Sequence, residues 1–506
     1  MQHHQGIDRN QLQMISLENM VEKQALVRVI DAFVDALNLE EFEFKYYQLN
    51  KEGRPPYHPA TLMKLYLYGY RNGIRTSRRL EKACKTNIEV MWLISQQQPH
   101  YKTIANFRKD NAKSFKQVFR YFVALLKDWD LIDGKTIAID SFKIRAQNSL
   151  KNNFNERKVK RHLNYIDGKI AEYEAELDKE FDQEIADKLA HNKNKKENYQ
   201  NIQQELKESD DGQISTTDPE AKAVVFQRNS VKVGYNVQAS TDGKHKLFIG
   251  ADTGDVNDTK ALTPMVEETK NNLGELEHSM NVLADKGYHS GREFKACENL
   301  DVITYVSPKE SSSAKSNPAF AKEAFSYNPK DDTYTCPADQ VLHTNGNYYK
   351  KGVREGRKPY QVKHYKTKAC QTCALRSQCT TNKHGRLIER SEFEQYVESN
   401  NERVNQNPEY YRERQQIIEH QFGTLKRQRN FDYTLMKGKT KVLAEVYISF
   451  TMYNLGRSLS ILGFDTLMER IKSVFYLFSR KLKLCRPMMH HIIISTVNTH
   501  RLHMAC

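Results

Sequence analysis

Two carboxylates at the ends of apolar runs are the strongest chemical feature of this sequence. Asp140 ends the run TIAID, and Asp285 ends the run VLAD. If the two runs form neighbouring strands, both carboxylates emerge at the same edge of a sheet, where they repel each other. A divalent cation removes that repulsion, and hard oxygen ligands favour Mg²⁺ or Mn²⁺. The alternative is that each aspartate merely caps a helix or a turn.

A third carboxylate, Glu419, lies in the segment YYRERQQIIEHQFGTLKRQRNF. Residues seven apart nearly eclipse on a regular α-helix, so Arg412, Glu419 and Lys426 are predicted to share one face. A carboxylate flanked by two cations suits a site that holds metal ions and phosphates. The alternative is a surface ladder of salt bridges, which is common on helices.

Four cysteines within 44 residues form a second candidate metal site. Cys370 and Cys373 make a C-x₂-C pair, with Cys336 before it and Cys379 after it. This composition within a loop-rich segment is typical of a structural zinc site with four thiolate ligands. The uneven C-x₅-C spacing leaves open the alternative of reduced cysteines without a metal.

The elements that must position these groups indicate an α/β fold with a mixed sheet. The predicted strands are residues 136–140, 231–240, 246–251, 281–285 and 302–306. Asp258 is expected to cap a helix over 260–271, and a second helix is expected at 292–299. The N-terminal part is predicted to be all-helical, with helices at 20–39, 60–70, 77–84, 87–93 and 101–111.

Changes of composition along the chain divide it into five regions. We expect a helical basic domain at 1–130, a catalytic core at 134–328, a cysteine-bearing insertion at 329–392, a helical end of the core at 393–464, and a basic apolar tail at 465–506. Within the core, residues 150–210 are rich in charge and show helical spacing, which predicts an inserted pair of antiparallel helices.

Composition and charge narrow the class of protein. The chain has 506 residues, of which 39% are hydrophobic and 28% charged, and this excludes a mainly disordered chain or a collagen. No run of eighteen apolar residues predicts a membrane span, and no export signal is evident, so we expect a cytoplasmic protein with reduced cysteines. The net charge of +15 favours a polyanionic partner, nucleic acid before membrane.

The positive charge is concentrated in two blocks. Residues 51–116 carry 14 basic and 4 acidic side chains, and residues 350–390 carry 12 basic and 2 acidic ones. In the first block the predicted DNA-binding residues are clustered near one helix start: Arg71, Arg75, Arg78 and Arg79. Such blocks suit contacts with phosphates, although a helical bundle with a solvated basic face is the alternative.

The three carboxylates and the sequence around them resemble the DDE core of bacterial insertion-sequence transposases, which has an RNase H-like fold. The segment ADKGYHSG, which contains Asp285, is similar to the segment around the family's second aspartate. Tyr411, Arg414, Glu419 and Lys426 are the nearest fit to the family's Tyr-Arg-Glu-Lys signature. The spacing from arginine to glutamate is one residue too long, so either Arg412 or Arg414 takes the arginine's part. The resemblance extends from DRNQL to residue 462 and includes RPPYHPATLMKLYLYGYRNGIRTSRRLE.

The resemblance implies a mobile-element enzyme that cuts and joins DNA. Two Mg²⁺ or Mn²⁺ ions would be held by Asp140, Asp285 and Glu419. Phosphates of the DNA would be bound by Tyr411, Arg412, Arg414 and Lys426. The implied partners are double-stranded DNA, as transposon terminal repeats and target, and a second copy of the chain in a synaptic complex near the nucleoid. The alternatives are a non-catalytic DNA-binding regulator and a structure-specific nuclease of the same fold.

Overall fold

The structure is a computed structural model that describes residues 10–12, 14–45, 52, 55–209, 212–226, 230–309, 317–353 and 358–474. The last 32 residues of the predicted C-terminal tail, 475–506, lie outside the described residues, and residues 464–474 form a helix. Among the described residues, no helix is long and apolar enough to cross a membrane.

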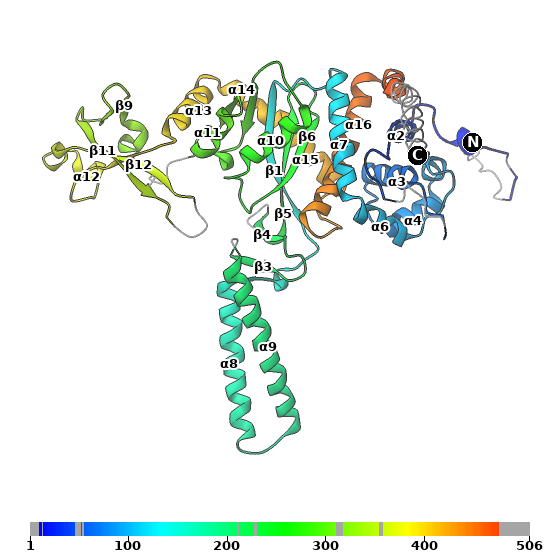
Figure 1. Ribbon diagram of the computed structural model, residues 1–506, viewed down its shortest axis with the longest axis horizontal. Coiled ribbons are helices and arrows are strands. Elements are labelled where there is room, and N and C mark those ends of the chain that lie inside the picture. Colours follow the sequence, from blue (N-terminus) through cyan, green and yellow to red (C-terminus); the bar gives the residue numbers. More distant parts are fainter. Residues whose placement is uncertain are drawn as a thin grey trace, which may run out of the picture.

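A mixed sheet of six strands lies at the centre of the molecule (Figure 1). Its strand order is β4 (Lys222–Val225), β5 (Val231–Asp242), β1 (Thr136–Arg145), β7 (Met280–Ala284) and β8 (Val302–Val306), and β6 (Phe248–Gly254) also pairs with β5. β1 runs antiparallel to β5 and parallel to β7, which in turn is parallel to β8. The predicted mixed sheet is therefore confirmed, and β5 and β6 pair as an antiparallel hairpin.

Helices cover this sheet and bury apolar side chains against it. The covering helices include α10 (Leu262–Leu273), α11 (Gly291–Glu298), α13 (Glu394–Gln406), α14 (Pro408–Arg414), α15 (His420–Gly423) and α16 (Lys439–Leu462). Phe142 of β1 packs against Phe422 of α15 and Phe450 of α16, with ring centroids 4.7 and 6.3 Å apart. The last helices of the chain are thus anchored on the first strand of the sheet.

The N-terminal part is helical, as predicted, but it does not stand apart from the rest. Its helices are α1 (Leu17–Met20), α2 (Leu26–Asp35), α3 (Pro59–Arg71), α4 (Ser77–Thr86), α5 (Ile88–Leu93), α6 (Tyr101–Asp110) and α7 (Ala112–Asp128). Phe119 of α7 lies 5.2 Å from the ring of Tyr447 in α16, and the buried residues of both parts belong to one continuous core. This continuity speaks against residues 1–130 as an independently folded unit.

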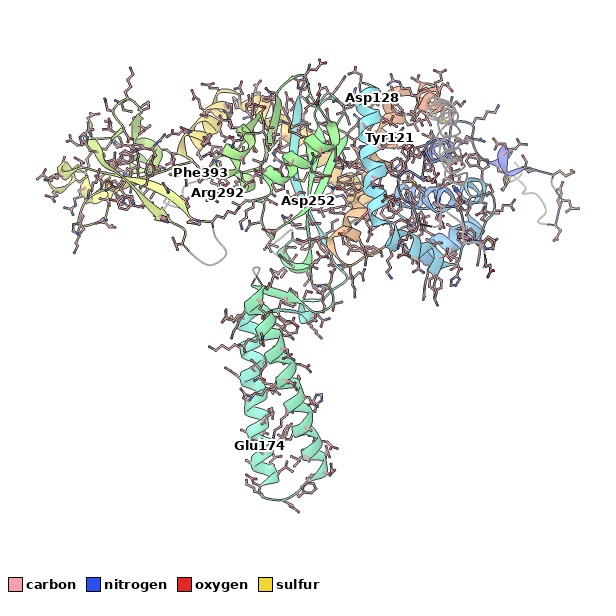
Figure 2. All side chains as sticks on the ribbon, in the orientation of Figure 1. Tyr121, Asp128, Glu174, Asp252, Arg292 and Phe393 are labelled. Atoms are coloured by element: carbon pink, nitrogen blue, oxygen red, sulfur yellow. The ribbon has the colours of Figure 1, made fainter. Side chains whose placement is uncertain are left out.

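Two long helices project from the central sheet as an antiparallel hairpin (Figure 1). They are α8 (Glu156–Leu177) and α9 (Gln183–Glu208), and they occur in the chain between β1 and β4, where the sequence predicted a charged helical pair. The base carries the short strands β2 (Asn153–Asn155) and β3 (Gln213–Ser215) and a small apolar core. Toward the tip, where Figure 2 labels Glu174, ion pairs such as Lys193–Glu174 at 2.8 Å join the helices.

A second sheet forms the end of the molecule opposite the N-terminal helices (Figure 1). It has the order β13 (Ile388–Ser391), β12 (Tyr360–Lys366), β11 (Val341–Lys351), β10 (Thr333–Thr335) and β9 (Ser326–Asn328), with the short helix α12 (Arg376–Cys379) beside it. This sheet has its own small core. Arg292 of α11 fastens it, because this side chain donates to the carbonyl of Pro359 at 2.9 Å and lies over the ring of Phe393 (Figure 2).

Candidate active site

Two carboxylates emerge side by side where strands β1 and β7 stop pairing. Ile137, Ala138 and Ile139 are fully buried, which favours a central strand, and Ile139 is in register with Ala284 of β7. Asp140 and Asp285 are the next residues of the two parallel strands, whose spacing in a sheet is about 4.8 Å. The structure therefore brings these two predicted site residues to the same edge of the sheet.

Asp140 is held in a charged and mostly buried environment. One of its carboxylate oxygens accepts the backbone N–H of Ser141 at 2.7 Å, and the other accepts from Arg414 at 2.9 Å. Burial raises the pKa of Asp140 to about 6, with further increases from the negative charges of Asp285 and Asp258, while Arg414 acts in the opposite direction. Arg414 thus offsets only part of the effect of burial on the pKa of this carboxyl group.

Arg414 joins the first and third carboxylates of the predicted triad. Its guanidinium lies 2.9 Å from Asp140 and 3.1 Å from Glu419, and its side chain is only 8% exposed, whereas that of Glu419 is 50% exposed. Arg412, the other candidate for the signature arginine, is exposed on the same helix. Of the two arginines, Arg414 is therefore the one that lies between the carboxylates.

A π-helical turn explains why the spacing from arginine to glutamate is one residue longer than expected. Helix α14 ends at Arg414, and residues Gln415–Glu419 form a π-helix, which accommodates one extra residue in a turn. The extra residue brings Glu419 back over Arg414 although the two are five positions apart. A second π-helix at Thr424–Gln428 follows, so the regular spacing behind the predicted common face of Arg412, Glu419 and Lys426 does not hold.

The remaining residues of the signature contact protein groups. The hydroxyl of Tyr411 donates to the carbonyl of Ala284 at 3.3 Å, directly before Asp285. The ammonium of Lys426 lies 5.7 Å from the ring centroid of Phe142, and burial lowers its pKa, as does the nearby Lys143. Tyr411 thus supports the strand end that carries Asp285, and Lys426 lies against the strand that carries Asp140.

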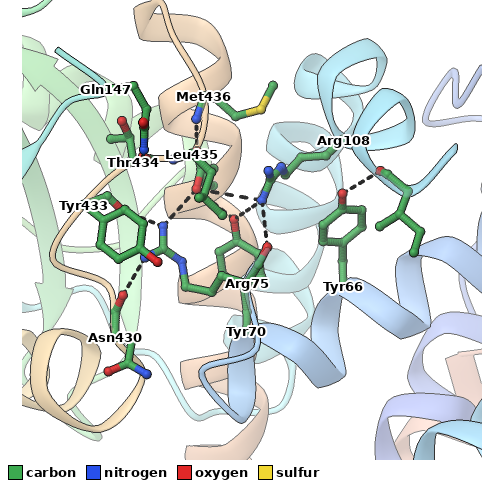
Figure 3. A network of polar contacts seen from close by, with 12 residues as sticks. Tyr66, Tyr70, Arg75, Arg108, Gln147, Asn430, Tyr433, Thr434, Leu435 and Met436 are labelled. Atoms are coloured by element: carbon green, nitrogen blue, oxygen red, sulfur yellow. Dashed lines mark hydrogen bonds and ion pairs between the residues drawn. The ribbon is translucent and has the colours of Figure 1, made fainter. Parts of the chain in front are cut away.

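The N-terminal arginines divide into buried and exposed side chains. Arg78 and Arg79 are exposed, and Arg71 is half-buried. The prediction that Arg75 binds DNA is wrong, because this residue is 2% exposed and both terminal nitrogens of its guanidinium are bonded inside the protein. It donates to the carbonyls of Asn430 and Tyr433 at 2.5 and 2.6 Å and pairs with Glu445 at 3.0 Å (Figure 3). A count of charges along a sequence cannot distinguish such a buried arginine from a solvated one.

Sequence reasoning also missed Glu445, which is fully buried in α16. One carboxylate oxygen accepts from Arg75 and from the hydroxyl of Tyr70, both at 3.0 Å, and lies 3.9 Å from Arg108. The other accepts the backbone N–H groups of Leu435 and Met436. A lone glutamate in the apolar run VLAEVYISF was the available signal, since a charged residue there needs a partner.

The four cysteines of the second sheet line one small cavity, together with apolar residues such as Phe325 and Leu342. The sulfur of Cys336 accepts the backbone N–H groups of Ala338 and Gln340, each at 3.4 Å. Burial raises the pKa of the Cys379 thiol, and the other three thiols contribute in the same direction. The thiols are therefore neighbours, as the sequence predicted.

Neither set of side chains forms a finished metal site. Across the residues that the structure describes, no group of three or more histidine, cysteine, aspartate or glutamate side chains is arranged to hold a metal ion. At the carboxylates, Arg414 is bonded to both Asp140 and Glu419. An ion at this place would therefore have to compete with the guanidinium.

Comparisons with known proteins point to one kind of enzyme. The model of a family described as "Transposase domain (DUF772)" matches residues 15–110, and that of a family described as "Transposase DDE domain" matches residues 335–459. The second match contains Glu419, while Asp140 and Asp285 lie between the two matches. No curated protein matches the chain. A piggyBac transposase in a synaptic complex with hairpin DNA is 9% identical over 89% of this chain and 79% of its own, with a TM-score of 0.32, too low to support an argument about the fold.

Proposed function

We propose that the chain is a DDE-type transposase that cuts and joins DNA at the ends of an insertion sequence, with Asp140, Asp285 and Glu419 as its catalytic carboxylates. The observation that carries this proposal is the bridge from Asp140 through Arg414 to Glu419, with Asp285 on the adjacent strand. Two carboxylates from separate parts of the chain bind one guanidinium, and a third lies on the adjacent strand, which an unrelated set of caps would not do.

We also propose that the central sheet is an RNase H-like core. In support, β1 carries the first carboxylate in the middle of the sheet, between antiparallel β5 and parallel β7. The core would then consist of residues 134–328 and 393–464. It would be split by two insertions, the α8–α9 hairpin and the second sheet within residues 329–392. In Figure 1 both insertions lie outside the central sheet.

The donor set fits hard divalent cations in its chemistry. All three side chains offer carboxylate oxygens, and the negative charges that raise the pKa of Asp140 are the ones that a cation would neutralise. Asp140 would be shared by two Mg²⁺ or Mn²⁺ ions, and Asp285 and Glu419 would hold one each. When bound, such ions supply a polarised attacking oxygen, a stabilised leaving oxygen and charge neutralisation at phosphorus.

The protein's own groups prepare this site. Arg414 keeps Asp140 and Glu419 together in the absence of ions and must release at least one of them when ions bind. Released from a carboxylate, its guanidinium is a bidentate donor suited to a phosphate of the DNA. Water would attack at the transposon end first, and the freed 3′-hydroxyl would then attack the second strand or the target.

We propose double-stranded DNA as the partner and a second copy of the chain in the synaptic complex. Support comes from the exposed side chains of Arg78 and Arg79 in the basic block 51–116. We further propose that Cys336, Cys370, Cys373 and Cys379 hold one structural zinc ion, since the four thiols line one cavity and Cys336 already accepts two N–H groups. Zinc would have to draw the thiols closer together.

The experiment that tests the catalytic assignment compares cleavage and strand transfer by carboxylate variants. The substrate is a duplex with the terminal repeats of the element that encodes the chain, in Mg²⁺. Asp140→Asn, Asp285→Asn and Glu419→Gln should each abolish both reactions and leave DNA binding intact, because an amide cannot hold the ion. The exposed Glu413→Gln is the matched control on the same helix.

Three outcomes separate the candidate functions. Cleavage by any one of the three carboxylate variants at the wild-type rate would show that the wrong carboxylate has been assigned. Cleavage without joining of 3′-hydroxyl ends would favour a nuclease, and DNA binding without cleavage would favour a regulator. Mn²⁺ is expected to restore part of the activity of a variant, since it tolerates imperfect ligand sets better than Mg²⁺.

DNA binding is tested in the full chain, because the N-terminal helices share their core with α16. The double variant Arg78→Ala/Arg79→Ala should reduce the slope of log affinity against log salt by about 2, as the loss of two phosphate contacts requires. Lys179→Ala, in the turn of the α8–α9 hairpin, is the control. An unchanged slope in the double variant would remove these two arginines from the DNA-binding surface.

A further inference from the structure

Asp258 lies beside the carboxylate pair and does not serve as the helix cap that the sequence predicts. It belongs to the loop between β6 and α10, but α10 begins at Leu262 with Ala261 as its N-cap. Its carboxylate lies beside Gly287, two residues after Asp285, and so faces the site from a third segment of the chain. Burial raises the pKa values of Asp140 and Tyr288, and the charge of Asp258 adds to both increases.

Two amide side chains of β5 hold this carboxylate in place. Gln238 and Asn236 donate to the same oxygen of Asp258, at 2.7 and 2.8 Å. Gln238 is 1% exposed and lies opposite Ser141 in the register of β1, one position from the partner of Asp140. Because its amide nitrogen is committed to a carboxylate, the amide oxygen of Gln238 must point the other way.

That oxygen accepts the hydroxyl of Tyr288, which is completely buried. Tyr288 closes the short 3₁₀ turn Lys286–Tyr288 that follows Asp285, and its backbone N–H donates to the carbonyl of Asp285 at 3.0 Å. The carboxylate of Asp285 accepts the N–H of Lys286 at the start of the same turn. Fixing the ring of Tyr288 therefore fixes the turn from which Asp285 projects.

Two glycines make room for this arrangement. A Cβ atom at Gly287 would lie 3.3 Å from a carboxylate oxygen of Asp258, and one at Gly254 would lie 2.8 Å from the amide nitrogen of Gln238. The turn of Asp285 therefore lies close beside the carboxylate of Asp258, in addition to their link through Gln238 and Tyr288.

We propose that Asp258 is a positioning residue of the DDE site, which acts through Gln238 and Tyr288 to hold Asp285 beside Asp140 for metal binding. This inference rests on the proposed function. The alternative is that Asp258 is itself a ligand of the ions. The two roles predict different effects of replacing Asp258 with asparagine on the affinity for the ions. The Asp258→Asn variant would keep an oxygen for Gln238 and Asn236, whereas an ion ligand would lose its charge.

The test measures Mn²⁺ binding to the full-length protein by the electron paramagnetic resonance signal of the free ion, together with the midpoint of thermal unfolding. Asp258→Leu and Tyr288→Phe should each raise the dissociation constant for Mn²⁺ by 10- to 100-fold, the usual effect of losing a group that orients a metal ligand. The double variant should be no weaker than Asp258→Leu alone, because both act through one path. Asp258→Asn should bind within about tenfold of wild type, since the acceptor oxygen remains.

The control is Asp255→Asn, which changes an exposed carboxylate three residues earlier in the same loop and should leave the affinity unchanged. A dissociation constant within twofold of wild type in Asp258→Leu, even with a lower unfolding midpoint, would overturn the proposal. So would independent losses that multiply in the double variant, or a loss in Asp258→Asn as large as that in Asp140→Asn. No Mn²⁺ binding by the wild-type chain, or wild-type affinity in Asp140→Asn, would instead overturn the proposed function.

Discussion

Arg414 and Glu419 form an ion pair at 3.1 Å across a π-helical turn, although five positions separate them in the sequence. On an α-helix the residue four positions after Arg414 would be its neighbour, and that residue, Ile418, is completely buried in the core. The π-helix thus keeps Ile418 inside while it brings Glu419 to the arginine. Such turns occur frequently at functional sites.

Loss of the Arg414 side chain should destabilise the metal-free protein. Arg414→Gln leaves Asp140, whose side chain is 20% exposed, beside two other carboxylates without its cation. Breaking a mostly buried pair costs about 3 kcal/mol of unfolding free energy. Urea denaturation without divalent ions measures this. Arg412→Gln, two positions away and exposed, should change the unfolding free energy by less than about 0.5 kcal/mol. Equal effects of the two variants would contradict the assignment of Arg414.

Deletion of Gln415 should be tolerated. Gln415 and Gln416 are exposed, and removing one residue from a π-helical turn returns it to an α-helix with both flanks in register. The deletion variant would also have the spacing of the family signature. We expect an unfolding midpoint at or above that of wild type, together with wild-type Mn²⁺ affinity. Deletion of the buried Ile417 is the control and should lower the midpoint sharply. A Gln415 deletion as damaging as that of Ile417 would refute the idea.

Neutralising Glu445 should weaken the junction between the N-terminal helices and α16. Glu445→Gln leaves Arg75 and Arg108, both nearly fully buried, without the carboxylate that pairs with them. An uncompensated buried charge costs about 3–5 kcal/mol. The expected result is a lower unfolding midpoint and earlier proteolysis of residues 1–130. Glu413→Gln, on the surface, should have no such effect, and unchanged stability of Glu445→Gln would show that the cluster contributes little.

The purified protein should contain about one zinc ion per chain. Cys373→Ser should abolish zinc binding and destabilise the second sheet without moving the central one, since the two have separate cores. Elemental analysis of protein prepared without chelators provides the measurement. Cys84→Ser, at an isolated cysteine of α4, is the matched control. Protein without zinc that is nevertheless folded would contradict the prediction.

Asp242 should make the stability of the protein depend on pH. It is completely buried at the end of β5, and burial raises its pKa to about 7, with a further increase from Asp133. A raised carboxyl pKa contributes stability that is present below about pH 4 and is lost as pH rises through about 7. Between pH 4 and 8 the unfolding free energy of Asp242→Asn should therefore rise relative to that of wild type. The increase should reach about 4 kcal/mol, at about 1.4 kcal/mol per pKa unit. Parallel pH profiles of unfolding free energy would refute this.

Asp140 and Asp285 could be predicted because a buried apolar run followed by a carboxylate is a local feature of the sequence. The predicted end of the first strand at residue 140 is wrong, because β1 continues to Arg145 and keeps Phe142 and Ile144 buried. The pairing of β1 with β7 is the only long-range assumption, and the structure has it in parallel register. Glu419 was singled out because helical spacing placed it between two cations, and its place beside the two aspartates followed from the resemblance.

The other parts of the site depend on information that local patterns do not carry. A π-helix differs from an α-helix by one residue in a turn, so helical periodicity misplaced Lys426 and left Arg412 and Arg414 undecided. Asp258 looked like a cap because it precedes a helix, and its link to Tyr288 runs through Gln238 on a different strand. Arg75 was assigned to the surface because its partners lie some 355 to 370 residues later in the chain.

That separation along the chain has a consequence for synthesis on the ribosome. Arg75 pairs with a residue 370 positions downstream. At the usual rates of about 5–20 residues per second, roughly 20–70 s pass between the emergence of the two residues. During that interval the nascent N-terminal helices hold two cationic side chains with no anion to pair with and an apolar face with no α16 to cover it. Translation thus delays the completion of the N-terminal core until almost the whole polypeptide has been made.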